Sequence, residues 1–329
     1  MSNPHWEKVK KSYANKRVLI TGADGFIGSH LTRALAQLGA LVHAAVHSTE
    51  RAWRLKDLVG KMEIYEANLT NIVDADRVMS TSKPDIVFNV ASRVDTRRDV
   101  TLLEEIIHNT YGISHNALSA ALRAGAGTFV QFGTIEEYGS NTAPFREDMR
   151  EKPVSPYSLG KTMATHEALL IGTSSDMCVC VVRPAATFGP RQGPGMLTPN
   201  FLKAALAGEN FGMNTGEQLR DFVFVDDLVE GVLLAGASER ANGETINLGS
   251  GRGMQVREFV EMLNSAMGKP IQVNFGAHPY RANDSMEFYM DSTKAKKLLG
   301  WEATTNIKEA IKMTVAWYRS NEDVLNRRA

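Results

Sequence analysis

The sequence contains very little cysteine, and the two cysteines that it has lie close together. Cys178 and Cys180 are the only ones in 329 residues, so disulfide bonds are not the main support of the fold. Both lie in the apolar run DMCVCVVRP, where a spacing of two places side chains on one face of a strand. Buried free thiols are therefore favoured over a metal site or a disulfide.

The sequence also lacks an excess of charge of either sign and lacks any long hydrophobic run. Lys plus Arg and Asp plus Glu both number 37, which gives no electrostatic reason to expect nucleic acid or an anionic membrane as a partner. No segment reaches the roughly 20 apolar residues of a membrane span, and residues 1–17 contain no apolar core of signal-peptide length. We therefore expect a cytoplasmic protein without nucleic-acid or membrane partners.

What the sequence does contain is a regular alternation of short apolar runs and helical patterns. The expected strands are 17–21, 41–46, 61–66, 85–90, 128–132 and 177–182. The expected helices between them include 72–80, 102–124 and one that begins near Tyr157. This alternation predicts the α/β class, as a Rossmann-type doubly wound parallel sheet with a smaller C-terminal substrate-binding lobe.

The composition changes after Arg183, where the segment PAATFGPRQGPGMLTPN is rich in Gly and Pro. We expect residues 1–184 to form a dinucleotide-binding domain and residues 185–329 to form the smaller lobe, with 220–250 returning to the first domain. Later helices are expected at about 200–207, 256–267, 293–299 and 307–318.

The first expected strand leads directly into a glycine-rich turn. Gly22, Gly25 and Gly28 follow at intervals of three, and Phe26 and Ile27 open the helix after them. Strand, glycine turn and helix in this order are typical of a dinucleotide-binding unit, in which the backbone approaches a pyrophosphate at the helix N-terminus. These five residues are predicted to contact the cofactor.

The stretch SPYSLGK places a tyrosine and a lysine on one face of a helix. Pro156 suits a first helical turn, so the helix is expected to begin near Tyr157, with Lys161 one turn later. A nearby ammonium favours a phenolate, so Lys161 is expected to lower the pKa of Tyr157 from its usual value of about 10. A lower pKa would suit Tyr157 for acid–base catalysis near neutral pH.

Together, the Gly22–Gly28 turn, the GTIEEYG stretch and the Tyr157/Lys161 pair resemble the extended short-chain dehydrogenase/reductase family, in its branch of nucleotide-sugar epimerases, dehydratases and 4-ketoreductases. The resemblance implies that Tyr157 exchanges a proton with a sugar oxygen, that Thr134 hydrogen-bonds this oxygen, and that Lys161 also holds the nicotinamide ribose. Asn109 matches a position that supports the lysine through water in relatives, with a plain helix–backbone contact as the alternative. Hydride transfer would belong to the nicotinamide.

The residues after the second expected strand bear on the choice between NADP and NAD. An acidic residue that binds the ribose hydroxyls of NAD is expected about 20 residues past the glycine turn, but no carboxylate stands near Val46. The residues that follow could instead bind a 2′-phosphate: His47, Ser48, Arg51 and Arg54. NADP is therefore expected, with NAD as the alternative and a solvated helix face as the other role of the arginines.

The resemblance also places the ends of the third and fourth strands beside the cofactor. Asn68 stands where relatives often have an aspartate that contacts adenine, and Leu69 follows it. Val90 and Ala91 end the fourth strand and are predicted to contact the cofactor as well.

The substrate is indicated by two arginines in the second half of the chain. Arg220 in RDFVFVDD and Arg281 in PYRAND match arginines that relatives use on the diphosphate of a sugar nucleotide. Such contacts are charge-assisted, so a nucleoside-diphosphate sugar is the expected substrate. Asn200, after the Gly/Pro-rich segment, is also assigned to substrate binding. The asparagine that relatives carry near the phosphate is Ala186 here, so that contact is missing or supplied elsewhere.

The residues after Thr134 narrow the range of candidate reactions. Glu136 stands where dehydratases of this branch carry the base that takes the proton from carbon 5, whereas Ile135 stands where many carry an acidic aspartate. Isoleucine cannot protonate a leaving water, and 4-ketoreductases can share the EEYG ending. We therefore expect NADPH-dependent reduction of a nucleoside-diphosphate 4-keto-6-deoxyhexose. A 4,6-dehydratase with Glu136 as base and a 4-epimerase with recycled cofactor are the alternatives. A non-catalytic regulatory module is remote, because the catalytic side chains are all present.

Relatives usually form a homodimer in which the Tyr157 helix and the 102–124 helix of each subunit build a four-helix bundle. Apolar residues in both helices would permit this arrangement: Leu102, Leu103, Ile106, Ile107, Met163, Leu169 and Leu170.

Overall fold

The chain folds around one seven-stranded parallel sheet. The structure is a computed structural model that describes residues 4–280 and 285–327. The strand order is β11-β6-β5-β4-β1-β2-β3, so the chain builds the sheet outward from β1 first on one side and then on the other. The strands are β1 Arg17–Thr21, β2 Leu41–Val46, β3 Glu63–Glu66, β4 Ile86–Asn89, β5 Thr128–Phe132, β6 Cys178–Pro184 and β11 Thr245–Leu248. The expected Rossmann-type doubly wound sheet is confirmed.

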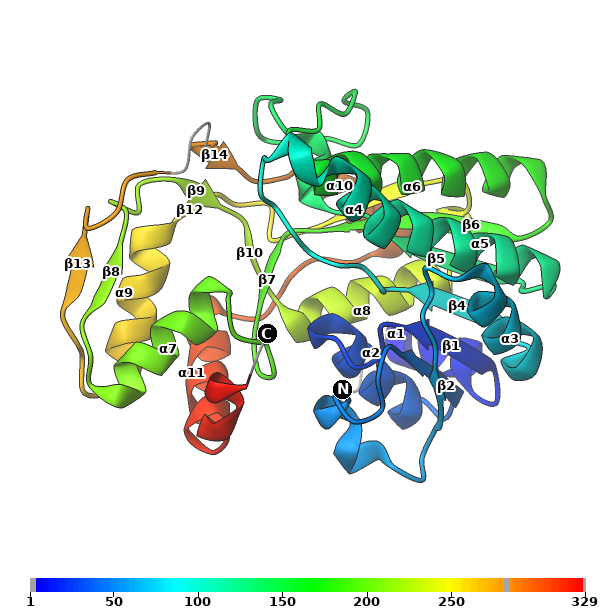
Figure 1. Cartoon of the computed structure of the whole chain (residues 1–329), viewed down its shortest axis with the longest axis horizontal. Helices are drawn as coiled ribbons and strands as arrows, with labels where there is room; N and C mark the ends of the chain where they lie inside the picture. The colour runs from blue at the N-terminus through cyan, green and yellow to red at the C-terminus, as the bar shows by residue number, and fades with distance from the viewer. Residues whose placement is uncertain (1–3, 281–284, 328–329) are drawn as a thin grey trace.

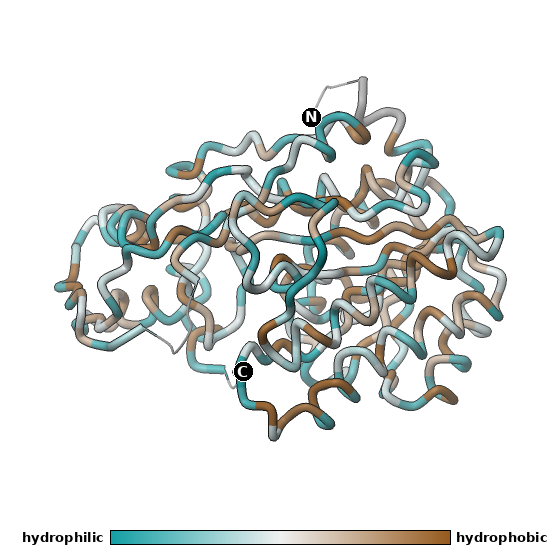
Figure 2. The backbone as a smooth tube through the Cα atoms, turned by 90° about the horizontal axis from the view of Figure 1, so that it is seen from above, coloured by the Kyte–Doolittle hydropathy of each residue, from teal (hydrophilic) through white to brown (hydrophobic). Residues whose placement is uncertain are grey.

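Helices cover both faces of this sheet (Figure 1). One face carries α3 Ile72–Ser82, α4 Leu103–Ile107, α5 Ile113–Arg123 and α6 Pro156–Ser174, and the other carries α1 Pro4–Tyr13, α2 Phe26–Gln37 and α8 Val225–Gly236. Successive strand residues point to opposite faces, so Leu19 packs in the apolar cluster under α3, α5 and α6, whereas Ile20 packs in the cluster under α2 and α8. Figure 2 shows the central strands as hydrophobic segments through the middle of the larger part.

The smaller part of the molecule consists of short strands and helices that follow β6. Its elements are β7 Ala186–Phe188, α7 Leu197–Ala207, β8 Phe211–Met213, β9 Leu219–Arg220, β10 Phe222–Phe224, β12 Met254–Gln255, α9 Val256–Ala266, β13 Val273–Phe275, β14 Glu287–Phe288 and α11 Ile307–Arg319. Helix α10 Thr293–Leu299 follows β14 in the chain but packs on β11 and α8 of the large sheet. The elements of the smaller part include three small sheets, β10-β7, β13-β8 and β12-β9-β14. Between β10 and β12 the chain returns to the large sheet to form α8 and β11.

Some element boundaries differ from those expected. β3 begins at Glu63, and α7 begins at Leu197, before the expected start at Asn200. The 102–124 helix is divided into α4 and α5 by a π-helical turn, His108–Gly112. Such turns insert an extra residue into a helix and often occur near functional sites.

Helix α1 is fixed on the sheet by its last residue. Tyr13 is fully buried, and its ring centroid lies 6.2 Å from that of Phe88. The Tyr13 hydroxyl donates a hydrogen bond to the Leu233 carbonyl oxygen in α8 at 2.6 Å. Within residues 4–280 and 285–327, no helix has the length and apolar character needed to cross a membrane.

Candidate active site

The glycine turn between β1 and α2 is closely packed at each of its three predicted positions, and most closely at Gly22 and Gly28. Gly22 has a φ of 64°, and a Cβ on it would lie 2.8 Å from the Cα of Ala91. A Cβ on Gly28 would lie 2.1 Å from the Gly22 carbonyl oxygen, and one on Gly25 would lie 3.0 Å from the same oxygen. Gly25 precedes α2 and offers no side-chain cap to the helix amides. The close backbone packing and the uncapped amides fit the diphosphate of a dinucleotide.

The other predicted residues of this region lie at the same edge of the sheet. Phe26 and Ile27 form the first turn of α2, and both are half-buried. Val90 and Ala91 follow β4 and are half-buried, and the close approach to Gly22 places Ala91 directly behind the turn. The structure therefore brings these predicted cofactor residues together.

A buried chain of hydrogen bonds crosses the carboxyl ends of β1, β4 and β5. The Thr21 hydroxyl donates to Asn89 Oδ1 at 2.7 Å, and the Asn89 side-chain amide donates to Gln131 Oε1 at 2.8 Å. Thr21 Oγ1 also accepts the amide of Ala91 at 3.1 Å. These bonds offset the cost of burying polar groups and fix the strand ends that carry the glycine turn. Sequence reasoning missed this chain, whose only signal is a polar residue at or near the end of three apolar strands.

Thr134 lies two residues after the end of β5 and caps the short 3-10 helix Ile135–Tyr138. Its hydroxyl accepts the amide of Glu136 at 3.3 Å, while Glu137 Oε1 accepts the amide of Thr134 at 2.7 Å. This reciprocal arrangement is a capping box, which fixes the backbone of Thr134 at the end of the strand.

Helix α6 presents Tyr157 and Lys161 one turn apart, as predicted. Pro156 is its first residue, and Ser155 Oγ accepts the amide of Ser158 at 3.1 Å as the N-cap. Both Tyr157 and Lys161 are buried, and Lys161 Nζ donates to the carbonyl oxygen of Phe132 in β5 at 2.9 Å. The lysine is therefore anchored at the end of the strand that leads to Thr134.

The electrostatics of this pair differ from the sequence expectation. Burial raises the pKa of Tyr157, the carboxylates of Glu136 and Glu137 raise it further, and a hydrogen bond with Thr134 lowers it. Burial lowers the pKa of Lys161 to about 8, against the opposing charge of Glu137. The expectation of a lowered pKa for Tyr157 is therefore wrong for the protein without bound ligands, because burial and two carboxylates raise this pKa.

Asn109 lies in the π-helical turn and bonds to its own helix. Its side-chain amide donates to the carbonyl oxygen of Glu105 at 2.8 Å, which is the plain helix–backbone contact weighed as the alternative. The turn packs closely on α6, because a Cβ on Gly160 would lie 3.1 Å from the Cβ of Thr110. The role of Asn109 in supporting Lys161 stays a prediction.

The residues predicted to bind a 2′-phosphate differ in exposure and in their contacts. His47 and Arg51 are exposed and Ser48 is half-buried. Arg54 instead donates from Nε to the Arg191 carbonyl oxygen at 2.8 Å and from Nη1 to the Asp24 carbonyl oxygen at 3.0 Å. Arg54 therefore ties the glycine turn to the crossover after β7, and its role toward a phosphate stays a prediction.

The ends of β2 and β3 carry two further polar side chains. Glu66 Oε2 accepts the amide and the hydroxyl of Thr49, both at 2.8 Å, and sequence reasoning missed this carboxylate because it belongs to the neighbouring strand. Asn68 is exposed, and its Oδ1 accepts the hydroxyl of Thr70 at 2.9 Å. Leu69, next to it, is buried.

The predicted substrate residues lie in the smaller part. Arg220 Nη1 donates to the carbonyl oxygens of Leu219 and Ser285 at 2.8 and 2.9 Å. Asn200 is exposed in α7, where its Oδ1 accepts the amide of Gly195 at 3.0 Å. Arg281 lies outside the described residues. Substrate binding by these three side chains stays a prediction.

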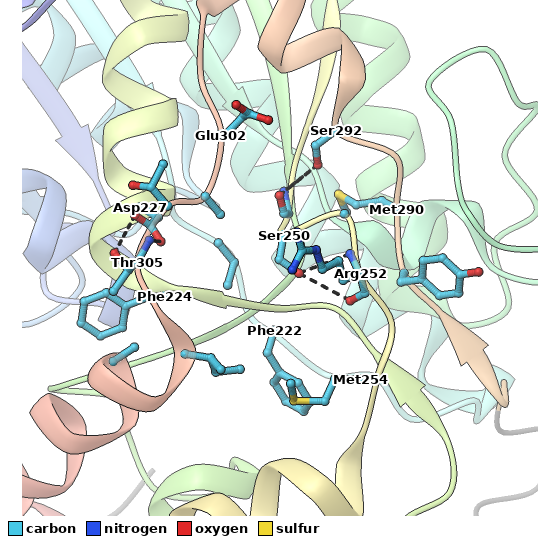
Figure 3. Close-up of a pocket in the computed structure, with 18 of the residues that line it drawn as sticks. Phe222, Phe224, Asp227, Ser250, Arg252, Met254, Met290, Ser292, Glu302 and Thr305 are labelled. Atoms are coloured by element: carbon cyan, nitrogen blue, oxygen red, sulfur yellow. Dashed lines mark hydrogen bonds between the residues drawn. The ribbon is translucent and has the colours of Figure 1, made fainter.

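A cavity of about 790 Å³ is bounded by β10, the first turn of α8, the loop after β11 and the segment before α11. Figure 3 shows Phe222 and Arg252 on its wall, and Asp227 bonded to the hydroxyl of Thr305. The Asp227–Thr305 distance is 2.8 Å. The predicted catalytic residues do not line this cavity, so it is separate from the site at Tyr157. Among the described residues, no group of three His, Cys, Asp or Glu side chains could hold a metal, and both cysteines are free thiols.

Comparisons with known proteins agree on one family. Residues 18–249 match the family model described as the NAD dependent epimerase/dehydratase family. The UDP-glucose 4-epimerase of Mycolicibacterium smegmatis is 33% identical over an alignment of 318 residues, which covers 92% of this chain and 99% of that protein.

Solved structures give the same result. An epimerase from Methanothermobacter thermautotrophicus has a TM-score of 0.90 and 26% identity, and the match covers 98% of each chain. The structure of MoeE5 in complex with UDP-glucose and NAD has a TM-score of 0.83 and 27% identity, over 93% of this chain and 99% of that one.

Proposed function

Since the chain belongs to the NAD-dependent epimerase/dehydratase family of nucleotide-sugar enzymes, we propose that it is a nucleoside-diphosphate-hexose 4-epimerase that recycles its nicotinamide cofactor. The observation that carries this proposal is the arrangement of Thr134, Tyr157 and Lys161. Thr134 acts on Tyr157 by lowering its pKa, and Lys161 is anchored to the strand that leads to Thr134.

The proposed mechanism places a sugar hydroxyl at carbon 4 against Thr134 and Tyr157. A bound nicotinamide would accept the hydride from carbon 4 and return it to the other face of the sugar. The Tyr157 oxygen takes the proton of the hydroxyl in the first half and gives it back in the second. Thr134 donates to the same sugar oxygen and orients it, and Lys161 would hold the ribose of the cofactor.

The choice of epimerisation over dehydration is supported by Ile135. This side chain is buried, so an apolar group occupies the position at which an acid would protonate the leaving water. Dehydration is the second candidate because the carboxylate of Glu136 acts on Tyr157 and could take a proton from carbon 5. The NADPH-dependent 4-keto reduction expected from the sequence is not supported by the comparisons.

We also propose NAD rather than the expected NADP as the resident cofactor. Arg54, one of the four residues behind the NADP prediction, is engaged by two carbonyl groups. A carboxylate, Glu66, stands at the end of β3 near His47, where it would repel a 2′-phosphate. The solved MoeE5 structure named above contains NAD.

The test is incubation of the purified protein with UDP-glucose and with UDP-galactose in D₂O, followed by NMR of the products. A 4-epimerase interconverts the two sugars without net change in nicotinamide absorbance and without deuterium at carbon 5. Deuterium at carbon 5 with a 4-keto-6-deoxy product would establish the dehydratase instead. Stoichiometric loss of NADPH with a 4-keto-6-deoxy sugar nucleotide would reinstate the reductase.

Three other expectations stay proposals. We propose that residues 1–184 with 220–250 bind the cofactor and that 185–329 otherwise bind the substrate. A homodimer through α4, α5 and α6 is supported by exposed apolar side chains on α4 and α6, including Leu103, Met163 and Leu170. The cytoplasmic location is a prediction from the sequence.

A further inference from the structure

Glu137 is a buried carboxylate that the proposed mechanism does not use. Its side chain is fully buried, and its Oε1 accepts the amide of Thr134 at 2.7 Å. Its Oε2 accepts the hydroxyl of Thr165 at 2.8 Å, and Nε and Nη2 of Arg183 at 3.0 and 2.7 Å. A buried carboxylate needs such hydrogen bonds and an opposite charge to offset its desolvation, and Glu137 has both.

Thr165 connects this carboxylate to the catalytic helix. Tyr157, Lys161 and Thr165 are spaced by four residues, so they lie along one face of α6. Thr165 is fully buried, and Glu137 therefore binds α6 on the face that presents Tyr157 and Lys161. The same carboxylate holds the backbone of Thr134, which follows β5.

Arg183 in β6 balances the charge of Glu137 and has a second carboxylate partner. Its Nη2 also binds Glu151 Oε1 at 2.6 Å, and its guanidinium lies 4.6 Å from the ring centroid of Tyr138. Among the hydrogen bonds of the described residues, none joins Glu151 to Thr134 or Thr165. Glu151 shares the arginine with Glu137, and its Oε2 lies 3.3 Å from Nε2 of His166 in α6. It is the matched control because it contacts α6 at His166 and not at Thr165, on the face that presents Tyr157 and Lys161.

We propose that Glu137 is a positioning residue, which holds Thr134 and the Tyr157–Lys161 face of α6 in a fixed position relative to each other. The inference rests on the roles proposed above for these three residues. It adds a fourth residue to the site, one that acts through the others and does not touch the substrate.

The charge of Glu137 has a separate, measurable effect. It opposes the burial that lowers the pKa of Lys161, and with Glu136 it adds to the burial that raises the pKa of Tyr157. On the side away from α6, Glu137 faces Arg183, with Glu151 beyond it. Replacing Glu137 by glutamine keeps its size and removes its charge, so Lys161 would lose its proton at a lower pH.

The experiment measures the affinity for NADH by fluorescence titration from about pH 6 to about pH 10, a range that spans the pKa of Lys161 at about 8. Its variants are Glu137→Gln, Glu151→Gln and Thr165→Val. In the wild-type protein, affinity is expected to fall as the pH passes about 8, where Lys161 loses its charge. In Glu137→Gln the midpoint of this fall is expected to move down by on the order of one pH unit.

The other two variants separate charge from position. Thr165→Val keeps the carboxylate, so it is expected to leave the midpoint unchanged while weakening NADH binding by about tenfold through misplaced Lys161. Glu151→Gln is expected to leave both the midpoint and the affinity near wild type, although its melting temperature falls. If Glu137→Gln does not fold, Thr165→Val still tests whether the contact between Glu137 and α6 positions Lys161.

The inference is overturned if Glu137→Gln keeps the wild-type midpoint, if Glu151→Gln moves it equally, or if Thr165→Val binds NADH as the wild type does. A wild-type affinity that does not change with pH also overturns the electrostatic effect. Because NADH binding needs no sugar nucleotide, the outcome is independent of whether the 4-epimerase assay succeeds.

Discussion

Gly28→Ala tests the fit between the glycine turn and the cofactor. The added methyl would lie 2.1 Å from the Gly22 carbonyl oxygen and 3.0 Å from the Gly22 carbonyl carbon, and both are backbone atoms. Since ordinary contact begins at 3.4 Å, α2 must retreat from the turn by about 1 Å. A displacement of this size at a binding group can cost about 100-fold, so we expect the Kd for NADH to rise by about two orders of magnitude. Overpacking would also lower the free energy of unfolding by about 1–3 kcal/mol.

The matched control is Gly39→Ala, just beyond the other end of α2. Gly39 has a φ of 81°, but a Cβ on it meets nothing within 4 Å. Alanine there would cost about 1–2 kcal/mol of backbone strain without moving the turn. NADH fluorescence titration and thermal melting of both variants give the comparison. The reasoning fails if Gly28→Ala binds NADH with wild-type affinity, or if Gly39→Ala weakens binding equally.

Tyr157→Phe should abolish turnover by at least about 1,000-fold while NADH still binds, because only the proton-carrying oxygen is lost; full activity in the epimerase assay would contradict the mechanism. Burial lowers the pKa of Lys161 from 10.5 to about 8, so the free energy of unfolding rises with pH between these values. Below pH 8 the folded protein bears the full cost of burying the charged lysine, about 3 kcal/mol. Lys161→Met should therefore be more stable than wild type at pH 7 in urea denaturation, by a margin that shrinks above pH 8; a constant margin would refute the assignment. Arg54→Lys should weaken NADH and NADPH equally, because Arg54 binds the carbonyl groups of Asp24 and Arg191; a loss confined to NADPH would restore the phosphate role.

The parts of the fold and site that were predicted correctly depend on local chemistry. Gly22 and Gly28 are needed because two backbone segments approach closely there, and glycine in the sequence directly indicates such an approach. Tyr157 and Lys161 share a helix face through their spacing, and Pro156 marks the start of that helix. The parallel sheet follows from the alternation of apolar strands with helices, which is visible in the sequence.

The parts that were missed depend on contacts between segments far apart in the chain. Glu137 and Arg183 are 46 positions apart, and no spacing rule indicates that they meet in the core. Arg54 looked available for a phosphate, yet its partners come from the glycine turn and from a loop 137 positions away. Glu66 supplies a carboxylate near the end of β2 from the adjacent strand, whereas the prediction considered only the residues that follow β2.

The wrong expectation for Tyr157 has a consequence for the reaction. Burial and the carboxylates of Glu136 and Glu137 keep its hydroxyl protonated, which suits the half-reaction that returns a proton to the sugar. The opposite half-reaction of the proposed mechanism would use the phenolate, which an additional positive charge in the site would favour. An oxidised nicotinamide carries that charge and a reduced one does not. The protonation of Tyr157 would then follow the redox state of the cofactor, as a reaction that removes and restores one hydride and one proton requires.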